Sequence, residues 1–327
     1  MRNRKNAIKN AYFLTVMILV LVLIISGLKI LENSLFAHDL NQATAVERKT
    51  IVRDGKEYFP RQDITIMLLM GIDQNGPVQD SGYHRNLGAA DMIALLIFDE
   101  KNEDCRILYL NRDTMVQIPV IGLGGTAAGF DYAQLALAHT YGNGLEESCE
   151  NTKKAVSDFL GGVAIDYYLS MNMDAISVLN DAVGGVTVTV EDDFSQVDPT
   201  IEMGKMTLRG QQAMNFVRTR QNLGDQLNVS RMDRQKAYME GFTDAFLQTM
   251  ENDADFVVAL YEQVAPYLVS DCSVNTISGM LSRYEGYEIR EITTPEGENV
   301  LGKQYYEFHA EEEKLDQLIL RLFYAPK

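Results

Sequence analysis

Three apolar segments decide the fold: ITIMLLMGID at 64–73, MIALLIFD at 92–99 and RILYLNRD at 106–113. Each has the length of a β-strand and is apolar almost without interruption, the pattern of strands that are buried on both faces. Segments with helical periodicity follow them along the chain, and apolar strands alternating with helices make layered structures. The sequence therefore predicts an α/β fold, a three-layer α/β/α domain with a central mixed sheet.

The elements after these strands follow from periodicity and from glycine. Helices are expected at 132–141, 145–160 and 173–182, and strands at 165–172 and 186–194. The glycine-rich segment 121–130 lacks the spacing of a phosphate-binding loop, so we expect a surface loop there.

A basic segment, FVRTRQNLGDQLNVSRMDRQ at 216–235, stands out in a chain whose net charge is −17. A short helix within 206–220 is expected to lead into Arg218 and Arg220, which are two residues apart, a spacing that places them on one face of an extended strand. Arg231 and Gln235 are four apart, which places them on one face of a helix. Because planar guanidinium groups suit multidentate binding of phosphate oxygens, the segment predicts a polyanion site.

Four further charged residues lie at the ends of the predicted strands. Asp73 ends the first apolar segment, Asp91 precedes the second, and Arg112 and Asp113 end the third. Taken singly, Asp73 is also typical of a turn and Asp91 of a strand start. Together they could bind Mg²⁺, with Mn²⁺ as the alternative, since Mg²⁺ takes one or two carboxylates plus phosphate oxygens. Arginines around a phosphate with a metal indicate phosphoryl transfer, and we expect Arg234 to bond a neighbouring acid instead.

The N-terminus predicts a membrane anchor. Residues 1–10 form a basic tail, and 11–31 are long and apolar enough to span a bilayer. The positive tail places the N-terminus in the cytoplasm and the rest outside, in a single-pass protein of the cell membrane. A cleaved signal peptide is the competing interpretation. The anchor is followed by a linker at 32–62 and a catalytic domain at 63–252. We expect a C-terminal α/β extension at 253–327 to pack on that domain.

The cysteines and histidines show no catalytic or metal-binding pattern. Cys105, Cys149 and Cys272 either form one disulfide, as an exported protein allows, or are buried apolar side chains. No serine–histidine–acid arrangement is apparent, and His84 and His139 are expected on a loop and on a helix surface.

Several motifs in this order resemble the LytR-CpsA-Psr family of membrane-anchored bacterial cell-wall enzymes. They are LLMGID at 68–73, AADM at 89–92, LNRDTMVQIP at 110–119, LNDAVGGVTVTV at 179–190, LRGQQAMNFVRTR at 208–220 and SRMDRQ at 230–235. The resemblance implies a phosphotransferase that moves a glycopolymer from a polyprenyl-pyrophosphate carrier to a hydroxyl of peptidoglycan.

The resemblance also implies roles for individual residues. Asp73 and Asp91 would help to bind the metal, and Asp91 or Asp113 would assist deprotonation of the acceptor hydroxyl, with Arg112 acting in catalysis as well. The pyrophosphate would be held by Arg112, Arg218, Arg220, Arg231 and Gln235.

The chain departs from the family pattern at two places. Ala89 stands where the family usually has an arginine, and Gln134 to Ala136 replace a Lys-Ile-Asn-like stretch. Arg85, four residues before Ala89, could supply the missing charge. The departures keep two alternatives open: a polyprenyl-phosphate-binding envelope protein with weak or no transfer, or a pyrophosphatase. A nucleic-acid partner is not expected, because the chain is strongly acidic.

Overall fold

The computed structural model describes residues 49–53, 55–122, 124–219, 256–284, 286–302 and 305–326, and between them also 234, 237–238, 240–242, 244–246 and 248–249. The predicted tail and membrane anchor lie outside this part of the chain. Among the helices within it, none is long and apolar enough to cross a membrane. The domain boundaries remain predictions.

A six-stranded sheet forms the centre of the molecule, with strand order β11-β8-β3-β4-β5-β12. The strands are β3 (Ile64–Ile72), β4 (Ala90–Asp99), β5 (Asp104–Leu110), β8 (Tyr167–Asn172), β11 (Leu268–Ser270) and β12 (Glu288–Thr293). The three segments predicted first are β3, β4 and β5, which pair antiparallel, whereas β8 runs parallel to β3 and β12 parallel to β5. The central mixed sheet is thus confirmed, and the C-terminal residues supply both of its edges.

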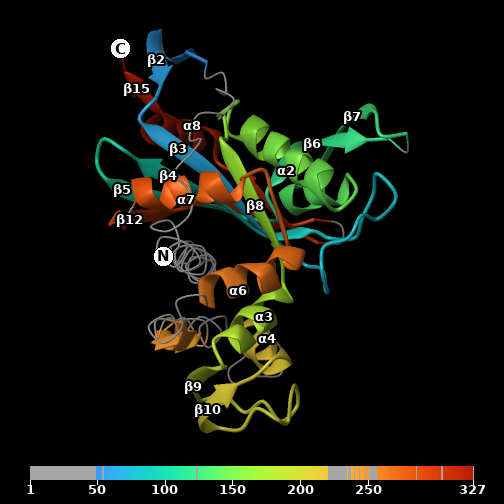
Figure 1. Cartoon of the computed structure of the whole chain (residues 1–327). Helices are drawn as coiled ribbons and strands as arrows, with labels where there is room; N and C mark the ends of the chain where they lie inside the picture. Colours follow the sequence, from blue (N-terminus) through green and yellow to red (C-terminus); the bar gives the residue numbers. More distant parts are fainter. Residues whose placement is uncertain are drawn as a thin grey trace.

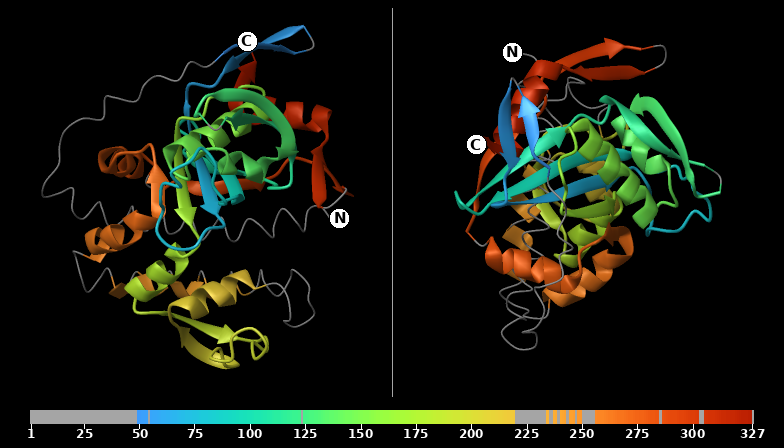
Figure 2. Two further views of the ribbon diagram at one scale, coloured as in Figure 1. Left: turned by 90° about the vertical axis from the view of Figure 1, so that its right-hand side faces the viewer. Right: turned by 90° about the horizontal axis from the view of Figure 1, so that it is seen from above.

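Helices cover both faces of this sheet (Figure 1, Figure 2). One face carries η1 (Leu135–Thr140), α2 (Glu146–Phe159) and α8 (Glu312–Phe323). The other carries α7 (Val274–Arg283), whose apolar side chains share one core with those of α6 (Phe256–Val264), α3 (Ala175–Ala182) and α4 (Gln211–Arg218). In β4, Met92 and Ala94 pack into the core on one face, and Ile93 and Leu95 into the core on the other. A strand that meets an apolar layer on each side must be apolar throughout.

A smaller lobe lies below the sheet in Figure 1. It contains α3, α4 and the antiparallel hairpin of β9 (Val186–Val190) and β10 (Gly204–Leu208). The valines of β9 are buried and its threonines are exposed, the alternation expected of a strand with one solvated face.

Two sequence predictions fail beside the sheet, around β6 (Met115–Ile121) and β7 (Ala127–Gln134). These strands form an antiparallel hairpin, so the expected loop at 121–130 is half strand and the expected helix at 132–141 is strand followed by η1. Pairing with β6 provides backbone hydrogen bonds that outweigh the weak strand propensity of alanine and glycine.

Short strands complete the periphery. They are β1 (Ile51–Arg53), β2 (Lys56–Pro60), β13 (Gly297–Leu301), β14 (Tyr306–Ala310) and β15 (Tyr324–Pro326), and a 3₁₀ turn, η2 (Ala265–Tyr267), precedes β11. None of the three cysteines forms a disulfide; Cys105 and Cys149 are buried, which supports the alternative of buried apolar side chains.

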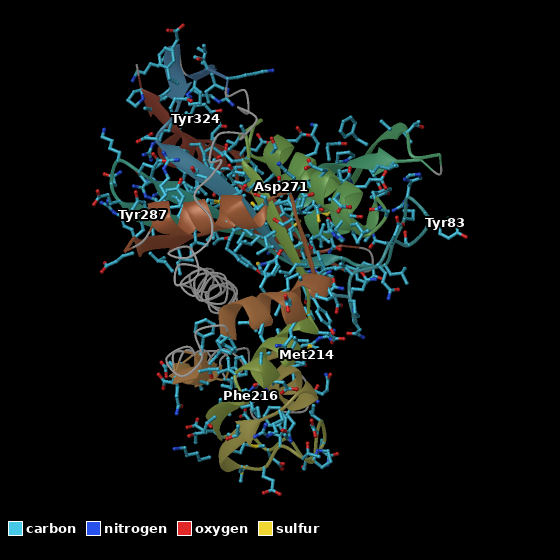
Figure 3. The ribbon with its side chains drawn as sticks, in the orientation of Figure 1. Tyr83, Met214, Phe216, Asp271, Tyr287 and Tyr324 are labelled. Atoms are coloured by element: carbon cyan, nitrogen blue, oxygen red, sulfur yellow. The ribbon has the colours of Figure 1, made fainter. Side chains whose placement is uncertain are left out.

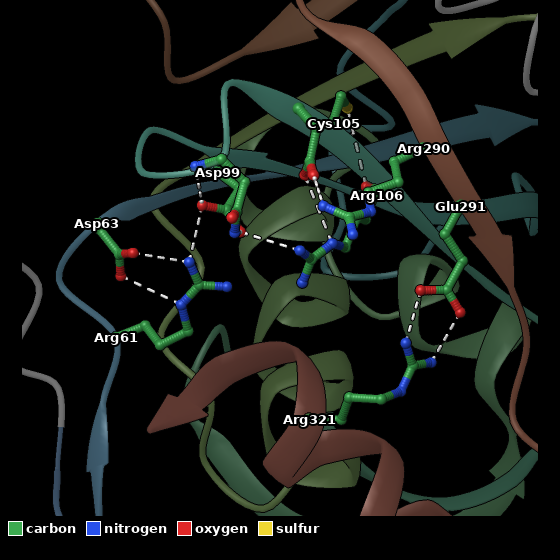
Figure 4. A network of polar contacts seen from close by, with 10 residues as sticks. Arg61, Asp63, Asp99, Cys105, Arg106, Arg290, Glu291 and Arg321 are labelled. Atoms are coloured by element: carbon green, nitrogen blue, oxygen red, sulfur yellow. Dashed lines mark hydrogen bonds and ion pairs between the residues drawn. The ribbon is translucent and has the colours of Figure 1, made fainter. Parts of the chain in front are cut away.

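An arginine–aspartate network closes one end of β4 and β5 (Figure 4). Asp99 is fully buried and pairs with Arg61 at 2.8 Å and with Arg106 at 3.1 Å. Burial acts to raise the pKa of Asp99, but hydrogen bonds from Asn102 and Arg61 outweigh it and hold that pKa below its usual value. The buried charge is fully compensated, as such charges must be.

Candidate functional site

The topology brings three of the predicted site residues together at the end of the sheet that lies opposite the Asp99 network. Because β3 and β4 run antiparallel, Asp73 at the end of β3 lies beside the start of β4, where Asp91 stands. Since β4 and β5 are also antiparallel, Arg112 just beyond β5 reaches the same place. We call this the site end of the sheet, and the opposite one the Asp99 end.

A β-bulge sets the position of Asp91. In the pairing of β3 with β4, Gly71 opposes Met92 but Ile72 opposes Ala90, so Asp91 is an extra residue in the ladder. The bulge shifts the alternation of the strand, and Ala90 packs into the core on the face used by the odd-numbered residues of β4. Bulges re-aim side chains and are common beside active sites.

Two arginine–aspartate pairs occupy the site end. Arg112 Nη1 lies 2.5 Å from Asp91 Oδ1, and Arg218 Nη2 donates to Asp73 Oδ1 at 2.8 Å. Their side chains are partly exposed: 35% for Arg112, 21% for Asp91, 49% for Arg218 and 41% for Asp73. Pairs this exposed contribute only about 0–1 kcal/mol. An anion could therefore take over the arginines at little energetic cost.

Arg112 also has a hydrogen-bond donor that no acceptor in the described part of the chain satisfies. Among the described residues, its Nε is buried without a hydrogen-bond acceptor; Asp113 Oδ1, at 3.6 Å, is too distant for one. That oxygen accepts a hydrogen bond from Gln134 Nε2 at 3.0 Å. A buried donor left over in this way costs about 1–3 kcal/mol, and such groups in native proteins call for a functional explanation.

The short helix expected before the arginine pair is α4, but it includes Arg218, which the spacing predicts to be extended. Arg218 is the last residue of α4, whose preceding residues Phe216 and Val217 are buried in the lower lobe (Figure 3). The two-residue spacing from Arg218 to Arg220 fits a strand, but the apolar pattern before it is helical, and burial of that face decides.

Arg234 fixes the end of this helix. Its Nε donates to the Phe216 carbonyl at 2.9 Å, and its other nitrogens contact the Thr219 carbonyl and the carboxylate of Asp192. The predicted bond to an acid is confirmed. Arg234 binds carbonyls at a helix C-terminus, where cationic side chains are favourable, and so holds Arg218 in place. The predicted ligands Arg220, Arg231 and Gln235 lie outside the described residues.

The segment before Asp91 contains Ala89, at the position of the family arginine, and Arg85, the residue that could supply the missing charge. Ala89 contributes its carbonyl, which accepts the N–H of Asp73 at 2.9 Å. Arg85 stacks on the ring of Tyr141, with 3.4 Å from its guanidinium carbon to the ring centroid. The cation–π contact holds one face of Arg85 at Tyr141.

A buried histidine that sequence reasoning misplaced supports the same segment. His139 is 1% exposed rather than on a helix surface, and its Nδ1 lies 2.8 Å from the Gly88 carbonyl. Burial lowers the pKa of His139 to about 4, so the neutral ring donates to Gly88. Asn86 adds hydrogen bonds to the His139 carbonyl at 2.7 Å and to Ser148 Oγ at 2.9 Å. No local pattern in the sequence indicates these contacts, which join distant segments.

The carboxylates suit one kind of metal. Within the described residues no group of three or more His, Cys, Asp or Glu side chains could hold an ion. Asp73 and Asp91 fit a hard cation such as Mg²⁺ or Mn²⁺, which accepts one or two carboxylates and completes its shell with phosphate oxygens and water.

A family profile and several relatives match the chain. The profile of the LytR_cpsA_psr family matches residues 31–322. The chain belongs to this family. It is 26% identical over 319 residues to the polyisoprenyl-teichoic acid–peptidoglycan teichoic acid transferase TagU of Oceanobacillus iheyensis, covering 93% of this chain and 91% of that protein. With TagT of Bacillus subtilis, which carries the same transferase name, it shares 27% identity over 244 residues, 68% of this chain and 69% of that protein.

Solved structures of similar fold agree with the architecture. A TagT bound to LI-WTA superposes with a TM-score of 0.53 at 22% identity, covering 80% of this chain and 90% of that one. The protein gbs0355 from Streptococcus agalactiae gives a TM-score of 0.58 at 22% identity, with 80% and 86% covered. The mixed α/β fold around a central mixed sheet is therefore that of the family.

Proposed function

We propose that this chain is a membrane-anchored phosphotransferase that attaches a glycopolymer, carried on a polyprenyl pyrophosphate, to peptidoglycan. The observation that carries the proposal is the two partly exposed arginine–aspartate contacts at the site end of the sheet, Arg112–Asp91 and Arg218–Asp73. Two guanidinium groups from separate elements, each paired with a carboxylate at the site end of the sheet, match the charge pattern of a metal-bound pyrophosphate. The transferase names of the relatives agree with this chemistry.

Binding of the donor would exchange the partners at the site. The pyrophosphate oxygens would take the guanidinium donors of Arg112 and Arg218, including the buried Nε of Arg112. Asp73 and Asp91 would then be released to hold Mg²⁺, or Mn²⁺ in its place, which neutralises charge on the phosphate oxygens. Arg220, Arg231 and Gln235 would complete the pyrophosphate shell from the basic segment.

Transfer would be a single displacement at phosphorus. The oxygen of an acceptor hydroxyl forms a bond to the phosphorus that bears the glycan, and the bond to the bridging oxygen breaks. Polyprenyl monophosphate leaves with that electron pair, and the hydroxyl proton passes to Asp91 or Asp113. Arg112, which contacts Asp91 and lies within 3.6 Å of Asp113, would stabilise the charge that develops on the leaving phosphate.

The proposal includes the predicted anchor. Residues 11–31 would hold the chain in the cell membrane with its N-terminus in the cytoplasm and the catalytic domain outside. Lipid-linked donor and peptidoglycan would both be within reach of a domain anchored in this way.

Ala89 favours a second candidate, an envelope protein that binds polyprenyl phosphates with weak or no transfer. A missing charged hydrogen bond removes about 1.5–3 kcal/mol from phosphate binding, and Arg85 is engaged with Tyr141. A pyrophosphatase, in which water replaces the acceptor hydroxyl, is the remaining alternative.

The test is a transfer assay on the full chain in detergent, with Mg²⁺, lipid-pyrophosphate-linked glycopolymer and peptidoglycan fragments. A covalent glycopolymer–peptidoglycan product that disappears in Arg112→Ala supports the proposal. Arg53→Ala is the matched control, because Arg53 is similarly exposed and pairs with Asp316 away from the site. Bound lipid without product would support the binding protein, and release of free glycan phosphate would support hydrolysis.

A further inference from the structure

The β6–β7 hairpin presents an exposed outer face beside the site. Val116 and Ile118 of β6 are buried, so the alternation of the strand turns Gln117 outward. Gln117 opposes Tyr132 of β7, and Phe130 lies two residues further along the same face. Phe130 is 62% and Tyr132 54% exposed. Two adjacent aromatic rings this exposed are typical of a binding surface rather than of a core.

This face begins at the catalytic groups. Gln134 is the next residue of β7 on the same side, and its Nε2 donates to Asp113 Oδ1 at 3.0 Å and to the Tyr306 carbonyl at 2.8 Å. Tyr306 is itself 62% exposed. At the rise of a strand, Tyr132 and Phe130 stand about 7 and 14 Å from Gln134. Gln117, Phe130, Tyr132 and Gln134 thus form what we call the aromatic face, which runs outward from Asp113.

The charges of the hairpin indicate which ligand suits it. Residues 115–134 contain no lysine, arginine or histidine, and their single acid is Asp131. A polyanion such as the phosphate-rich donor polymer would meet no cation from the hairpin itself. Aromatic rings with amide groups between them suit uncharged sugar rings, whose C–H faces stack on aromatics and whose hydroxyls bond to amides.

We propose that the aromatic face binds the sugar backbone of the acceptor peptidoglycan and directs one of its hydroxyls toward the phosphate at Arg112. This inference rests on the proposed transfer reaction and assigns its acceptor side. The face adjoins Asp113 through Gln134, so a glycan lying on Tyr132 brings its next sugars to the carboxylates that would take the hydroxyl proton.

The experiment measures binding of an uncharged N-acetylglucosamine oligosaccharide strand, which has the sugar backbone of peptidoglycan without its lactyl carboxylates, to the full chain in detergent, by calorimetry. Tyr132→Ala is expected to bind about fivefold more weakly and the double variant with Phe130→Ala about 20-fold more weakly. Tyr132→Phe keeps the ring and is expected to bind like the parent. Phe59→Ala, an exposed aromatic on β2, is the matched control and leaves binding unchanged.

Two further measurements separate this inference from the proposed function. In the transfer assay, Tyr132→Ala raises the KM for peptidoglycan with little change in kcat, and binding of inorganic pyrophosphate stays at the parental value. A parent that binds the strand through Tyr132 but forms no product supports the face and contradicts the transfer proposal. The inference is overturned if transfer occurs with an unchanged KM in the double variant. It is equally overturned if the double variant binds the glycan like the parent but loses binding to a polyglycerol phosphate or to a protein.

Discussion

The two ends of β4 carry the same residue types in different settings. At the Asp99 end, Asp99 is fully buried and its partners Arg61 and Arg106 are only 10% and 13% exposed. At the site end, Arg112 and Asp91 are 35% and 21% exposed. In the part of the chain that the structure describes, Asp99 at the first end is fully paired although the neighbouring Asp104 Oδ1 is buried without a hydrogen bond, whereas the second end leaves a buried Arg112 donor without an acceptor.

The difference shows how a structural cluster is distinguished from a binding one. A buried, mutually satisfied network stabilises the fold and loses much when one member is removed. Exposed pairs contribute little to stability and can exchange their partners for a ligand. Composition alone does not separate the two ends, but the exposure of the paired side chains does.

The largest expected effect is at the site end. Asp91→Asn should lower transfer by about 100- to 1,000-fold, since it removes a charge that contacts Arg112 and would bind the metal or the proton. Its unfolding midpoint in urea should stay near the parental value, because the pair is exposed. A large loss of stability with normal transfer per folded molecule would contradict the assignment.

The matching change at the Asp99 end should lower stability and leave transfer unchanged. Asp99→Asn leaves Arg61 and Arg106 without their buried partner and should lower the free energy of unfolding by about 3 kcal/mol. Transfer per folded molecule should be retained. The comparison between the ends breaks down if this variant is as stable as the parent but inactive.

The buried His139, which hydrogen-bonds the segment before Asp91, should make the free energy of unfolding depend on pH. Its pKa is about 4 in the folded protein against 6.5 ordinarily, so between these values the unfolded chain binds a proton that the folded one does not. Stability is fully present above pH 6.5 and is lost as the pH falls toward 4. From pH 7 to pH 5 this loss is about 2 kcal/mol. Urea unfolding of His139→Gln at both pH values should show a decrease smaller than the parental one by that amount, and equal decreases would contradict it.

Restoring the family arginine is the smallest of the expected effects. Ala89→Arg should tighten binding of a soluble polyprenyl pyrophosphate by about tenfold, by adding a charged donor. Ala89→Gln, similar in length but uncharged, is the control. Equal affinities for the two variants would show that position 89 does not face the phosphate.

Much of the fold was predictable because its strands are buried on both faces. Continuous apolar segments of strand length end at Asp73 and at Asp113, and a third follows Asp91. This pattern is typical of central strands, and all three segments are strands of the sheet. Their ends also indicated the site, since charged residues at strand ends of a layered fold meet at one edge. The resemblance in motifs pointed to the same residues.

The rest depended on contacts between distant segments. The spacing of Arg218 fits a strand, yet burial of the preceding apolar face makes it the end of a helix. His139 is buried because it meets Gly88, and β7 is a strand because it pairs with β6. Arg220, Arg231 and Gln235 lie outside the described residues, so their roles stay predictions.

The most direct test of the account compares two arginines at opposite ends of β5. Calorimetry with geranyl pyrophosphate and Mg²⁺ on the full chain in detergent would be run beside urea unfolding for Arg112→Ala and Arg106→Ala. The account predicts that Arg112→Ala binds about 10- to 100-fold more weakly with an unchanged unfolding midpoint. Arg106→Ala should unfold more readily and bind like the parent. Parental affinity in Arg112→Ala, or an equal loss of affinity in both variants, would contradict the central claim.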